Sequence, residues 1–329
     1  MNEIVFFINK ALMSGIIVGS IYALGAVGLT LIFGILRFAH FAHGDVMTLG
    51  AFITLVLAGL ISALGFSSPV PLALIAMLPA MALTAGVAVG LDRWFYKPLR
   101  DRKSRPIIIV IASVGVTLML QGLIRLFAGT GTRDMFFDQP KEIFRIPVPG
   151  ATRSVVVTEP QLVLILFTLV AVVALHLFLT RSRLGKAMRA VSDNADLARI
   201  SGIDINTVAR ATWVIGGSLA CAAGTLLAMD VVLKPDLAYN ILLAIFAATI
   251  VGGIGQPYGA IAGGFLVGFS ESLAIYNWTT LLRPIWPFQI ELPATLALVP
   301  TEYKLVVPFV ILIIVLVYRP TGIFRGRVL

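Results

Sequence analysis

Charged residues are scarce in this sequence. Only 12% of its 329 residues are Asp, Glu, Lys or Arg, which is about half the share of a soluble domain. Hydrophobic residues make up 59% of the chain, and the mean hydropathy is +0.99. This composition excludes a soluble globular protein and predicts an integral membrane protein with several spans.

Cysteine is nearly absent, because Cys221 is the only one. No intrachain disulfide can form, so the redox compartment cannot be inferred. The sequence contains no G-x-x-x-x-G-K-[ST] motif, so this chain is not expected to hold ATP phosphates in the usual way. The first residues, MNEIVFFINK, lack a basic region and a small-residue cleavage site, and no removable signal peptide is expected.

Long apolar runs are what the sequence does contain. Each has a length near the ~20 residues that a bilayer core requires. They cover residues 11–36, 46–66, 69–91, 106–128, 160–180, 208–229, 238–254, 258–278 and 304–318. Backbone groups in lipid must pair within their own segment, and these runs lack the alternation of barrel strands. The sequence predicts an all-α, polytopic transmembrane helix bundle of about 8–10 spans in a single domain, 1–329.

Basic residues predict the orientation. Lys and Arg are concentrated in 92–105, in 181–210 and after Tyr318, and such segments face the cytoplasm. The net charge of +9 therefore reflects membrane topology, and nucleic-acid binding is not expected. Segment 129–159 mixes both signs and is expected on the extracytoplasmic side. An odd number of spans then places the amino terminus outside and the carboxyl terminus inside.

The stretch RFAHFAHGD interrupts the first apolar runs with Arg37, His40, His43, Gly44 and Asp45. If the two histidines share a helix face with the carboxylate beside them, they resemble part of a metal site, but the ligand set is incomplete. We therefore expect no metal. A helix break that lines a substrate path is the favoured interpretation, with Gly44 relaxing the backbone and His43 and Asp45 pairing with freed backbone groups. An ordinary cytoplasmic turn remains the alternative.

A second interruption, ATIVGGIGQPYGAIAGGFLVG, surrounds Gly252, Gly253 and Gly255. It is either a tight turn or the partner of the first break in a pseudo-symmetric pair. The glycines that follow at a spacing near four residues favour close helix packing.

Glu271 lies inside an expected span, where a carboxylate usually faces a partner or a cavity. Arg125 is expected at a comparable depth and could pair with it. A functional gate and a structural ion pair are both open interpretations.

The polar stretch SDNADLARISG predicts a short helix between spans. Ser192 or Asp193 can cap its start, Leu197 and Ile200 share a face, and Gly202 can end it. The preceding LGKAMRAV forms another helical piece with an apolar side. The apolar face needs a partner, which is either the lipid headgroups or another protein.

Three stretches carry a resemblance to a known family. RFAHFAHGDVMTLGAF, RAVSDNADLARISGIDI and YRPTGIFRG resemble the first spans, the ATPase-contacting loop and the ending of the permease subunit of branched-chain amino-acid ABC importers. The resemblance covers most of the chain. Two departures are Asp45, where many relatives carry Glu, and a longer segment 277–303 that has no assigned role.

The resemblance implies a multi-pass permease of the inner (cytoplasmic) membrane, with a cytoplasmic carboxyl terminus and contacts to membrane lipid. Its partners would be a second permease subunit in a heterodimer, two ATP-binding subunits and an extracytoplasmic substrate-binding protein. The chain itself would be no enzyme and need no cofactor, because ATP hydrolysis would occur on the partners. The cargo would be branched-chain or other small apolar amino acids.

Alternatives are an ABC permease for urea or short amides, a secondary transporter with its own ion-coupling site, or a channel. A membrane-embedded enzyme would need a convergent set of reactive side chains, which the sequence does not offer.

Two groups of candidate site residues follow. The expected translocation path contains Arg37, His40, His43, Gly44, Asp45, Gly252, Gly253, Gly255 and Glu271. The expected ATPase-coupling residues, in a loop within 181–207, are Arg189, Asp193, Asn194, Ala195, Leu197, Gly202 and Ile203.

Overall fold

The computed structural model describes residues 2–66, 68, 70–136, 141–283 and 293–324. The first half contains α1 (Asn2–Phe7), η1 (Ile8–Leu12), α2 (Met13–Leu36), α3 (His43–Ala63), α4 (Leu72–Leu91), η2 (Asp92–Tyr96), α5 (Lys97–Asp101), α6 (Pro106–Ala128), β1 (Ile143–Pro147) and β2 (Ser154–Thr158). The second half contains α7 (Glu159–Arg181), α8 (Arg183–Asp193), α9 (Ala195–Ile200), α10 (Ile205–Asp230), α11 (Tyr239–Gly252), α12 (Pro257–Ile275), α13 (Thr279–Leu282), η3 (Thr301–Tyr303) and α14 (Val306–Tyr318).

The expected helical membrane fold is confirmed. In the part of the chain that the structure describes, seven helices are long and apolar enough to cross a bilayer. The longest, Asn2–Leu36, runs without interruption through α1, η1 and α2. The apolar helices α11 and α14 are shorter, at 14 and 13 residues. All nine predicted runs therefore form helices, of which seven have a full spanning length.

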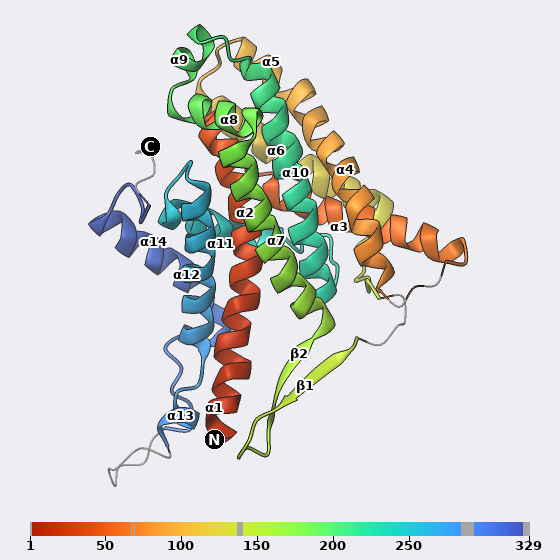
Figure 1. The fold of residues 1–329 in the computed structure, drawn as a ribbon, viewed down its shortest axis with the longest axis vertical. Coiled ribbons are helices and arrows are strands. Elements are labelled where there is room, and N and C mark those ends of the chain that lie inside the picture. Colours follow the sequence, from red (N-terminus) through yellow and green to blue (C-terminus); the bar gives the residue numbers. More distant parts are fainter. Residues whose placement is uncertain (1, 67, 69, 137–140, 284–292, 325–329) are drawn as a thin grey trace.

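Helix α2 lies in the centre of the bundle, against α10 and α12 (Figure 1). The glycine stripe of α12 explains the closeness of one contact. A Cβ atom added at Gly264 would lie 2.5 Å from the backbone nitrogen of Ala23, and one at Gly268 would meet the backbone of Gly19. Only glycine fits at such helix crossings. The interpretation of this stripe as a packing surface is confirmed.

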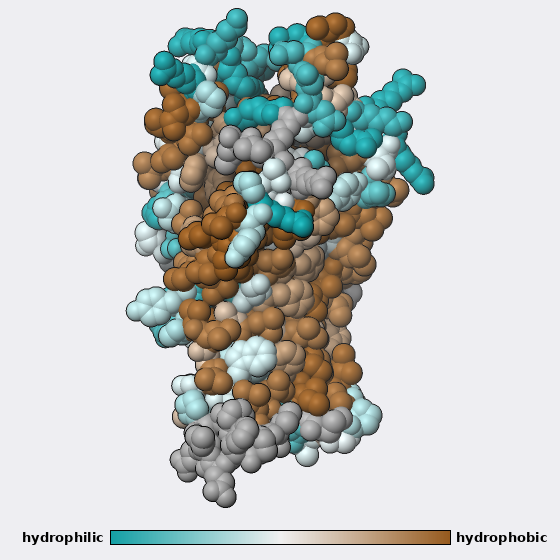
Figure 2. Space-filling view, turned by 90° about the vertical axis from the view of Figure 1, so that its left-hand side faces the viewer, coloured by the Kyte–Doolittle hydropathy of each residue, from teal (hydrophilic) through white to brown (hydrophobic). Residues whose placement is uncertain are grey.

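The two ends of the bundle differ in charge and in structure. The basic segments around α5, α8 and α9 share one end, whereas the amino terminus and the β1–β2 hairpin lie at the other (Figure 1). Asn2 ties the amino terminus to that hairpin through hydrogen bonds with Thr152. Figure 2 shows a brown apolar band across the middle of the molecule and teal polar side chains above it. This layering is the one that a bilayer imposes.

The hairpin is an addition to the predicted all-α fold. β1 and β2 pair in antiparallel register, with Arg145 opposite Val156, inside the segment 129–159 that was expected to be extracytoplasmic. Residues 137–140 of that segment, the tail residues 325–329, and 284–292 within the long segment 277–303 lie outside the described residues.

Candidate functional site

The break after α2 exists, but it is built differently from the prediction. Helix α2 ends at Leu36, and Arg37 adopts a left-handed conformation with φ 60° and ψ 34°. Helix α3 begins at His43, so the non-helical residues are 37–42. Gly44 lies within α3, without a positive φ angle, and the expectation that it relaxes the backbone is wrong. It is small for another reason, since a Cβ atom there would lie 2.9 Å from the carbonyl oxygen of Ala238.

Helix α6 satisfies the freed backbone groups of this break. The Ser113 hydroxyl accepts a 3.2 Å hydrogen bond from the backbone N–H of Phe41 and lies 3.4 Å from the carbonyl oxygen of Ala39. The expectation that His43 and Asp45 fill this role is wrong, because His43 bonds the backbone of Gly25 in the middle of α2 and not the residues of the break. Asp45 instead faces Thr117, Gln121 and Arg125 of α6.

His40 anchors the break in an aromatic cluster. Its Nε2 atom lies 3.0 Å from the Tyr96 hydroxyl, and its ring stands edge-on to Trp213 with the centroids 4.9 Å apart. Burial lowers the pKa of His40 well below its usual range, so the imidazole is neutral. Because His40 lies in the break rather than on a helix, it does not share a helix face with His43 as the sequence suggested. The two rings still lie edge-on to each other, with their centroids 6.1 Å apart.

The second break is a tight turn between α11 and α12. Gly253 and Gly255 have φ angles of 113° and 79°, which favour glycine. The backbones of Gly252 and Gly259 approach so closely that neither position can hold a side chain. The N–H of Gly255 donates a 2.9 Å hydrogen bond to the Thr30 hydroxyl, which fixes the turn against the last turns of α2. Of the two alternatives that the sequence left open, a tight turn or the partner of the first break in a pseudo-symmetric pair, the structure has the tight turn.

The expected coupling segment forms two short helices, α8 and α9. The predicted cap at Ser192 or Asp193 is wrong, because α8 stays helical through Asp193. Asn194 is the residue with extended backbone angles, and its side chain accepts hydrogen bonds from the N–H groups of Asp196 and Leu197. The C′ position of Gly202 is confirmed by its φ of 83° and by its backbone N–H bond to Arg199.

The two helices of the segment have different surroundings. Met188 and Val191 of α8 are buried in the body of the bundle, at 1% and 0% exposure. Leu197 and Ile200 of α9 are 61% and 84% exposed. Helix α8 therefore packs on the membrane-spanning helices, and α9 presents two adjacent apolar side chains outward.

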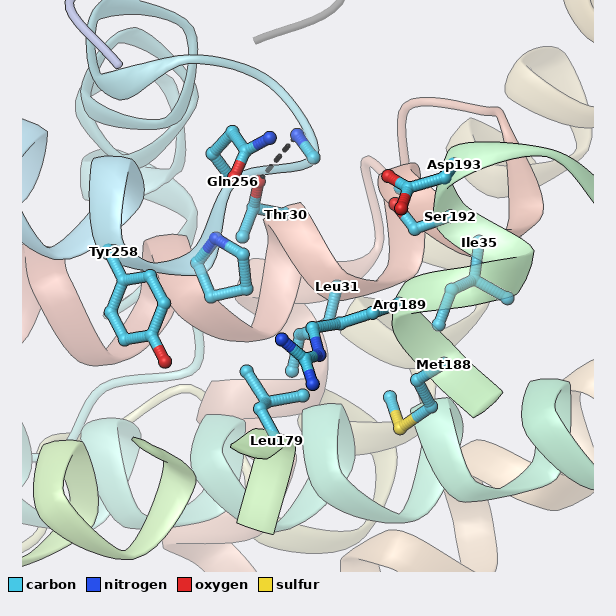
Figure 3. A pocket seen from close by; sticks show the side chains of 13 residues that line it. Thr30, Leu31, Ile35, Leu179, Met188, Arg189, Ser192, Asp193, Gln256 and Tyr258 are labelled. Atoms are coloured by element: carbon cyan, nitrogen blue, oxygen red, sulfur yellow. Dashed lines mark hydrogen bonds between the residues drawn. The ribbon is translucent and has the colours of Figure 1, made fainter. Parts of the chain in front are cut away.

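Both breaks contact α8 of the expected coupling segment. The Arg37 guanidinium donates a 3.0 Å hydrogen bond to the carbonyl oxygen of Ser192. A pocket of about 280 Å³ lies where α2, α8 and the α11–α12 turn come together. Figure 3 shows Thr30 and Gln256 on one side of it and Ser192, Asp193 and Arg189 on the other. The structure thus brings Arg37 and Gly255 of the expected path beside Arg189 and Asp193 of the expected coupling set.

Glu271 lies elsewhere in the bundle. Its carboxylate accepts a 2.7 Å hydrogen bond from the Tyr22 hydroxyl and lies 3.7 Å from the Lys304 ammonium. The expected pair with Arg125 is wrong, because α12 packs on α2, α11 and α14, whereas α6 packs on α3. Arg125 contacts Gln121 on its own helix instead. Tyr22 is about 22 Å of helix away from Arg37, so Glu271 is not part of the cluster around the breaks.

Sequence reasoning missed several partners of these residues. Tyr22 and Lys304 flank Glu271, and Tyr96, Trp213 and Ser113 hold the first break. Lys304 offered a weak signal, since it is a cation at the start of the last apolar run. The others carry no sequence signal, because they depend on which helices are neighbours.

Sequence comparison relates the chain to known proteins over most of its length. A family model described as "Branched-chain amino acid transport system / permease component" matches residues 11–316. The high-affinity branched-chain amino acid transport system permease protein BraD of Pseudomonas aeruginosa is 31% identical, over 99% of this chain and 98% of its own. LivH of Escherichia coli (strain K12), a permease protein of the same description, is 30% identical with the same coverage. A probable LivH of Methanocaldococcus jannaschii is 30% identical over 82% of each chain.

Proposed function

The chain belongs to the family of branched-chain amino acid transport system permease components, and we propose that it forms the translocation path of an ATP-driven importer. The cargo is a branched-chain or other small apolar amino acid. The observation that carries the proposal is the match over nearly the whole chain, including both helix breaks and the coupling segment. The relatives are named as permeases for these amino acids, which favours this cargo over urea or short amides.

ATP hydrolysis occurs on two separate ATP-binding subunits in this proposal, and the segment within 181–207 transmits it. The exposed side chains of Leu197 and Ile200 on α9 support such a docking role. Helix α8 is joined to the end of α2 through Arg37, so a displacement of α9 that moves α8 would also move the first break. The proposed coupling residues are Arg189, Asp193, Asn194, Ala195, Leu197, Gly202 and Ile203.

The path itself is lined in this proposal by residues of the two breaks, of the start of α3 and of α12. Its residues divide into a cytoplasmic group near the coupling segment and the separate carboxylate of Glu271. The cytoplasmic group contains Arg37, His40, His43, Gly44, Asp45, Gly252, Gly253 and Gly255. Within this group, the buried histidines and Asp45 fix the start of α3 rather than contact the cargo.

The assembly that this proposal requires contains a second permease subunit, the two ATP-binding subunits and an extracytoplasmic binding protein. The whole chain, 1–329, acts as one permease domain in the inner membrane, with its carboxyl terminus on the cytoplasmic side. The hairpin segment 129–159 then faces the binding protein. Its position at the end opposite α8 and α9 supports this orientation (Figure 1).

Reconstitution in liposomes tests the function. Uptake of labelled leucine is measured with the full set of subunits and ATP, and again with ATP-binding subunits that lack the phosphate-binding lysine of their Gly-Lys motif. We expect uptake only with the intact subunits and ATP, and competition by isoleucine and valine but not by urea. Gradient-driven uptake by this chain alone would indicate a secondary transporter and would overturn the proposal.

A further inference from the structure

A second polar pocket lies at the same end of the bundle as the coupling segment but on other helices. It has a volume of about 460 Å³ and lies between the α4–η2–α5 helix and the start of α10. Four of its lining residues are basic and one is acidic, namely Arg93, Lys97, Arg100, Arg210 and Asp92. None of them takes part in the proposed path or coupling segment.

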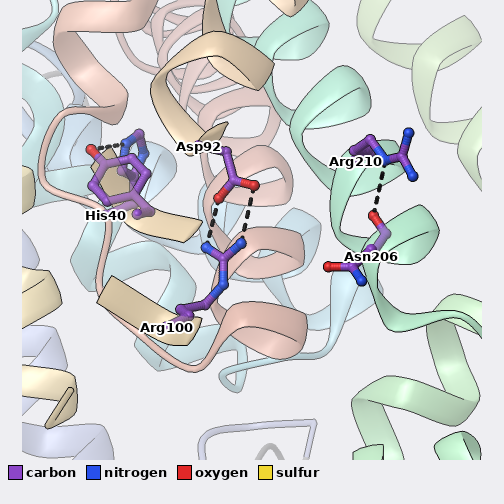
Figure 4. A network of polar contacts seen from close by, with 6 residues as sticks. His40, Asp92, Arg100, Asn206 and Arg210 are labelled. Atoms are coloured by element: carbon purple, nitrogen blue, oxygen red, sulfur yellow. Dashed lines mark hydrogen bonds and ion pairs between the residues drawn. The ribbon is translucent and has the colours of Figure 1, made fainter. Parts of the chain in front are cut away.

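The acidic residue is already neutralised. Both carboxylate oxygens of Asp92 accept hydrogen bonds from Arg100, at 2.6 and 3.0 Å (Figure 4). A bidentate pair of this kind is geometrically fixed. It removes one positive and one negative charge from the balance of the pocket. The charges of Arg93, Lys97 and Arg210 remain.

Arg93 and Lys97 have no matching anion among the described residues, whereas the charge of Arg210 is partly offset by the carboxylate of Asp204. None of the three cations has a carboxylate oxygen of the described residues within 4.0 Å. Arg210 makes one bond, from Nε to the carbonyl oxygen of Asn206 at 3.4 Å (Figure 4). The nearby carboxylate of Asp204 caps α10 through the backbone N–H groups of Asn206 and Thr207. The pocket thus carries an excess of positive charge and several unused N–H donors.

The depth of the pocket is indicated by the aromatic residues beside it. Trp94 and Phe95 follow Arg93 directly and are 74% and 39% exposed. Exposed tryptophan at the end of a spanning helix marks the level of the lipid headgroups. The basic residues Arg102 and Arg105 follow within a few residues, as expected for a cytoplasmic boundary. The phosphate groups of bilayer lipids lie at the same level as such an aromatic belt.

We propose that this pocket binds the phosphate group of an anionic phospholipid from the cytoplasmic leaflet. Arg93 and Arg210 present guanidinium groups suited to paired N–H bonds with phosphate oxygens, and Lys97 adds a point charge. Basic pockets between spanning helices on the cytoplasmic side are suited to such headgroups. The bound lipid connects η2 to α10, and η2 also contains Tyr96, which holds His40 in the first break.

Native mass spectrometry of the purified full-length chain tests this site. Retention of phosphatidylglycerol is compared with that of phosphatidylcholine of the same acyl chains. The pocket variant is Arg93→Gln/Lys97→Gln/Arg210→Gln, and the matched control is Arg102→Gln/Lys103→Gln/Arg105→Gln, which removes the same charge outside the pocket. We expect the wild type and the control to prefer phosphatidylglycerol, and the pocket variant to bind it about tenfold or more weakly. An equal loss of phosphatidylglycerol retention in the pocket variant and in the control variant would contradict the proposed lipid site.

Two further measurements distinguish a bound lipid from other possible occupants of the pocket. A large excess of inorganic phosphate should leave lipid retention unchanged, and displacement would indicate a site for free anions instead. Retention should persist when the ATP-binding subunits are present, and its loss would show that the pocket contacts protein. If the triple variant does not fold, Arg93→Gln alone serves, because this exposed side chain makes no ion pair in the described structure. A several-fold loss is then expected, and unchanged retention would contradict the proposal.

Discussion

The Arg37 guanidinium and the carbonyl oxygen of Ser192 are joined by a hydrogen bond of 3.0 Å. Arg37 is the left-handed residue that ends α2, and Ser192 lies in the last turn of α8. A cation at the carboxyl end of a helix is also favoured by the helix dipole. The bond therefore joins the first break to the helix through which the ATP-binding subunits are proposed to act.

Removing this bond should uncouple transport. Arg37→Gly deletes the guanidinium but keeps the left-handed backbone, because glycine adopts positive φ readily. We expect uptake in the reconstituted complex to fall several-fold, while ATP hydrolysis and the melting temperature change little, since one exposed hydrogen bond contributes about 1 kcal/mol. Arg37→Lys, which restores a donor, is the control and should recover part of the uptake. Normal uptake by Arg37→Gly would show that this hydrogen bond is not needed to couple ATP hydrolysis to transport.

A side chain at Gly44 should destabilise the fold, because α3 packs closely there against Ala238 and Leu242. A Cβ atom there would lie 2.9 Å from the Ala238 carbonyl oxygen and 3.3 Å from the Leu242 side chain. We expect Gly44→Ala to lower the free energy of unfolding by about 1–3 kcal/mol, measured as a lower melting temperature in detergent. Gly122→Ala in α6 is the matched control, since nothing lies within 4 Å of its added Cβ. An equal effect of the two substitutions would argue against this explanation.

Hydropathy predicted the helices because the lipid solvent imposes them residue by residue. All nine apolar runs became helices, and the Gly264 and Gly268 stripe became a packing surface. The pairing of Glu271 with Arg125 failed, although both lie in spanning helices. Hydropathy gives the depth of a residue, but not which helices are neighbours.

The wrong predictions about the helix cap, Gly44 and the hairpin concern local backbone conformation, which residue type does not determine alone. Ser192, Asp193 and Asn194 are all good capping residues by type, and only the backbone angles of Asn194 decide among them. Gly44 was assigned a flexible backbone from its residue type, whereas Arg37 took the left-handed conformation. The β1–β2 hairpin had a signal in the run SVVVT, whose three valines are typical of a strand.

The cap of α9 offers a test of the coupling segment. Asn194→Ala removes the acceptor for the N–H groups of Asp196 and Leu197, which costs about 1 kcal/mol of helix stability. We expect lower uptake per ATP hydrolysed, with the membrane-spanning bundle intact. Asn194→Asp keeps the cap and should transport normally. If the alanine variant also couples normally, the order of α9 does not matter for transport.

The exposed apolar pair on α9 should act in assembly rather than in folding. Leu197→Ser/Ile200→Ser changes side chains that are 61% and 84% exposed, so the melting temperature of the isolated chain should stay nearly constant. Co-purification of the ATP-binding subunits should decrease strongly, because the docking face loses its apolar contact area. The matched control is Val231→Ser, a 54% exposed position that follows α10. Undiminished co-purification of the α9 variant would mean that the subunits bind elsewhere.

Substitutions at Glu271 and Tyr22 distinguish a role of Glu271 in the translocation path from a purely structural role. In Glu271→Gln, the amide oxygen can still accept the hydrogen bond of Tyr22, so the fold should lose about 1 kcal/mol or less. The negative charge facing Lys304 is removed, however, and a path that depends on this charge should transport several-fold less. Tyr22→Phe is the complementary change, because it keeps the charge and removes the bond. We expect Glu271→Gln to lower uptake, normalised to assembled complex, more than Tyr22→Phe does. If both variants lose stability and neither loses normalised uptake, Glu271 serves only to hold α2, α12 and the start of α14 together.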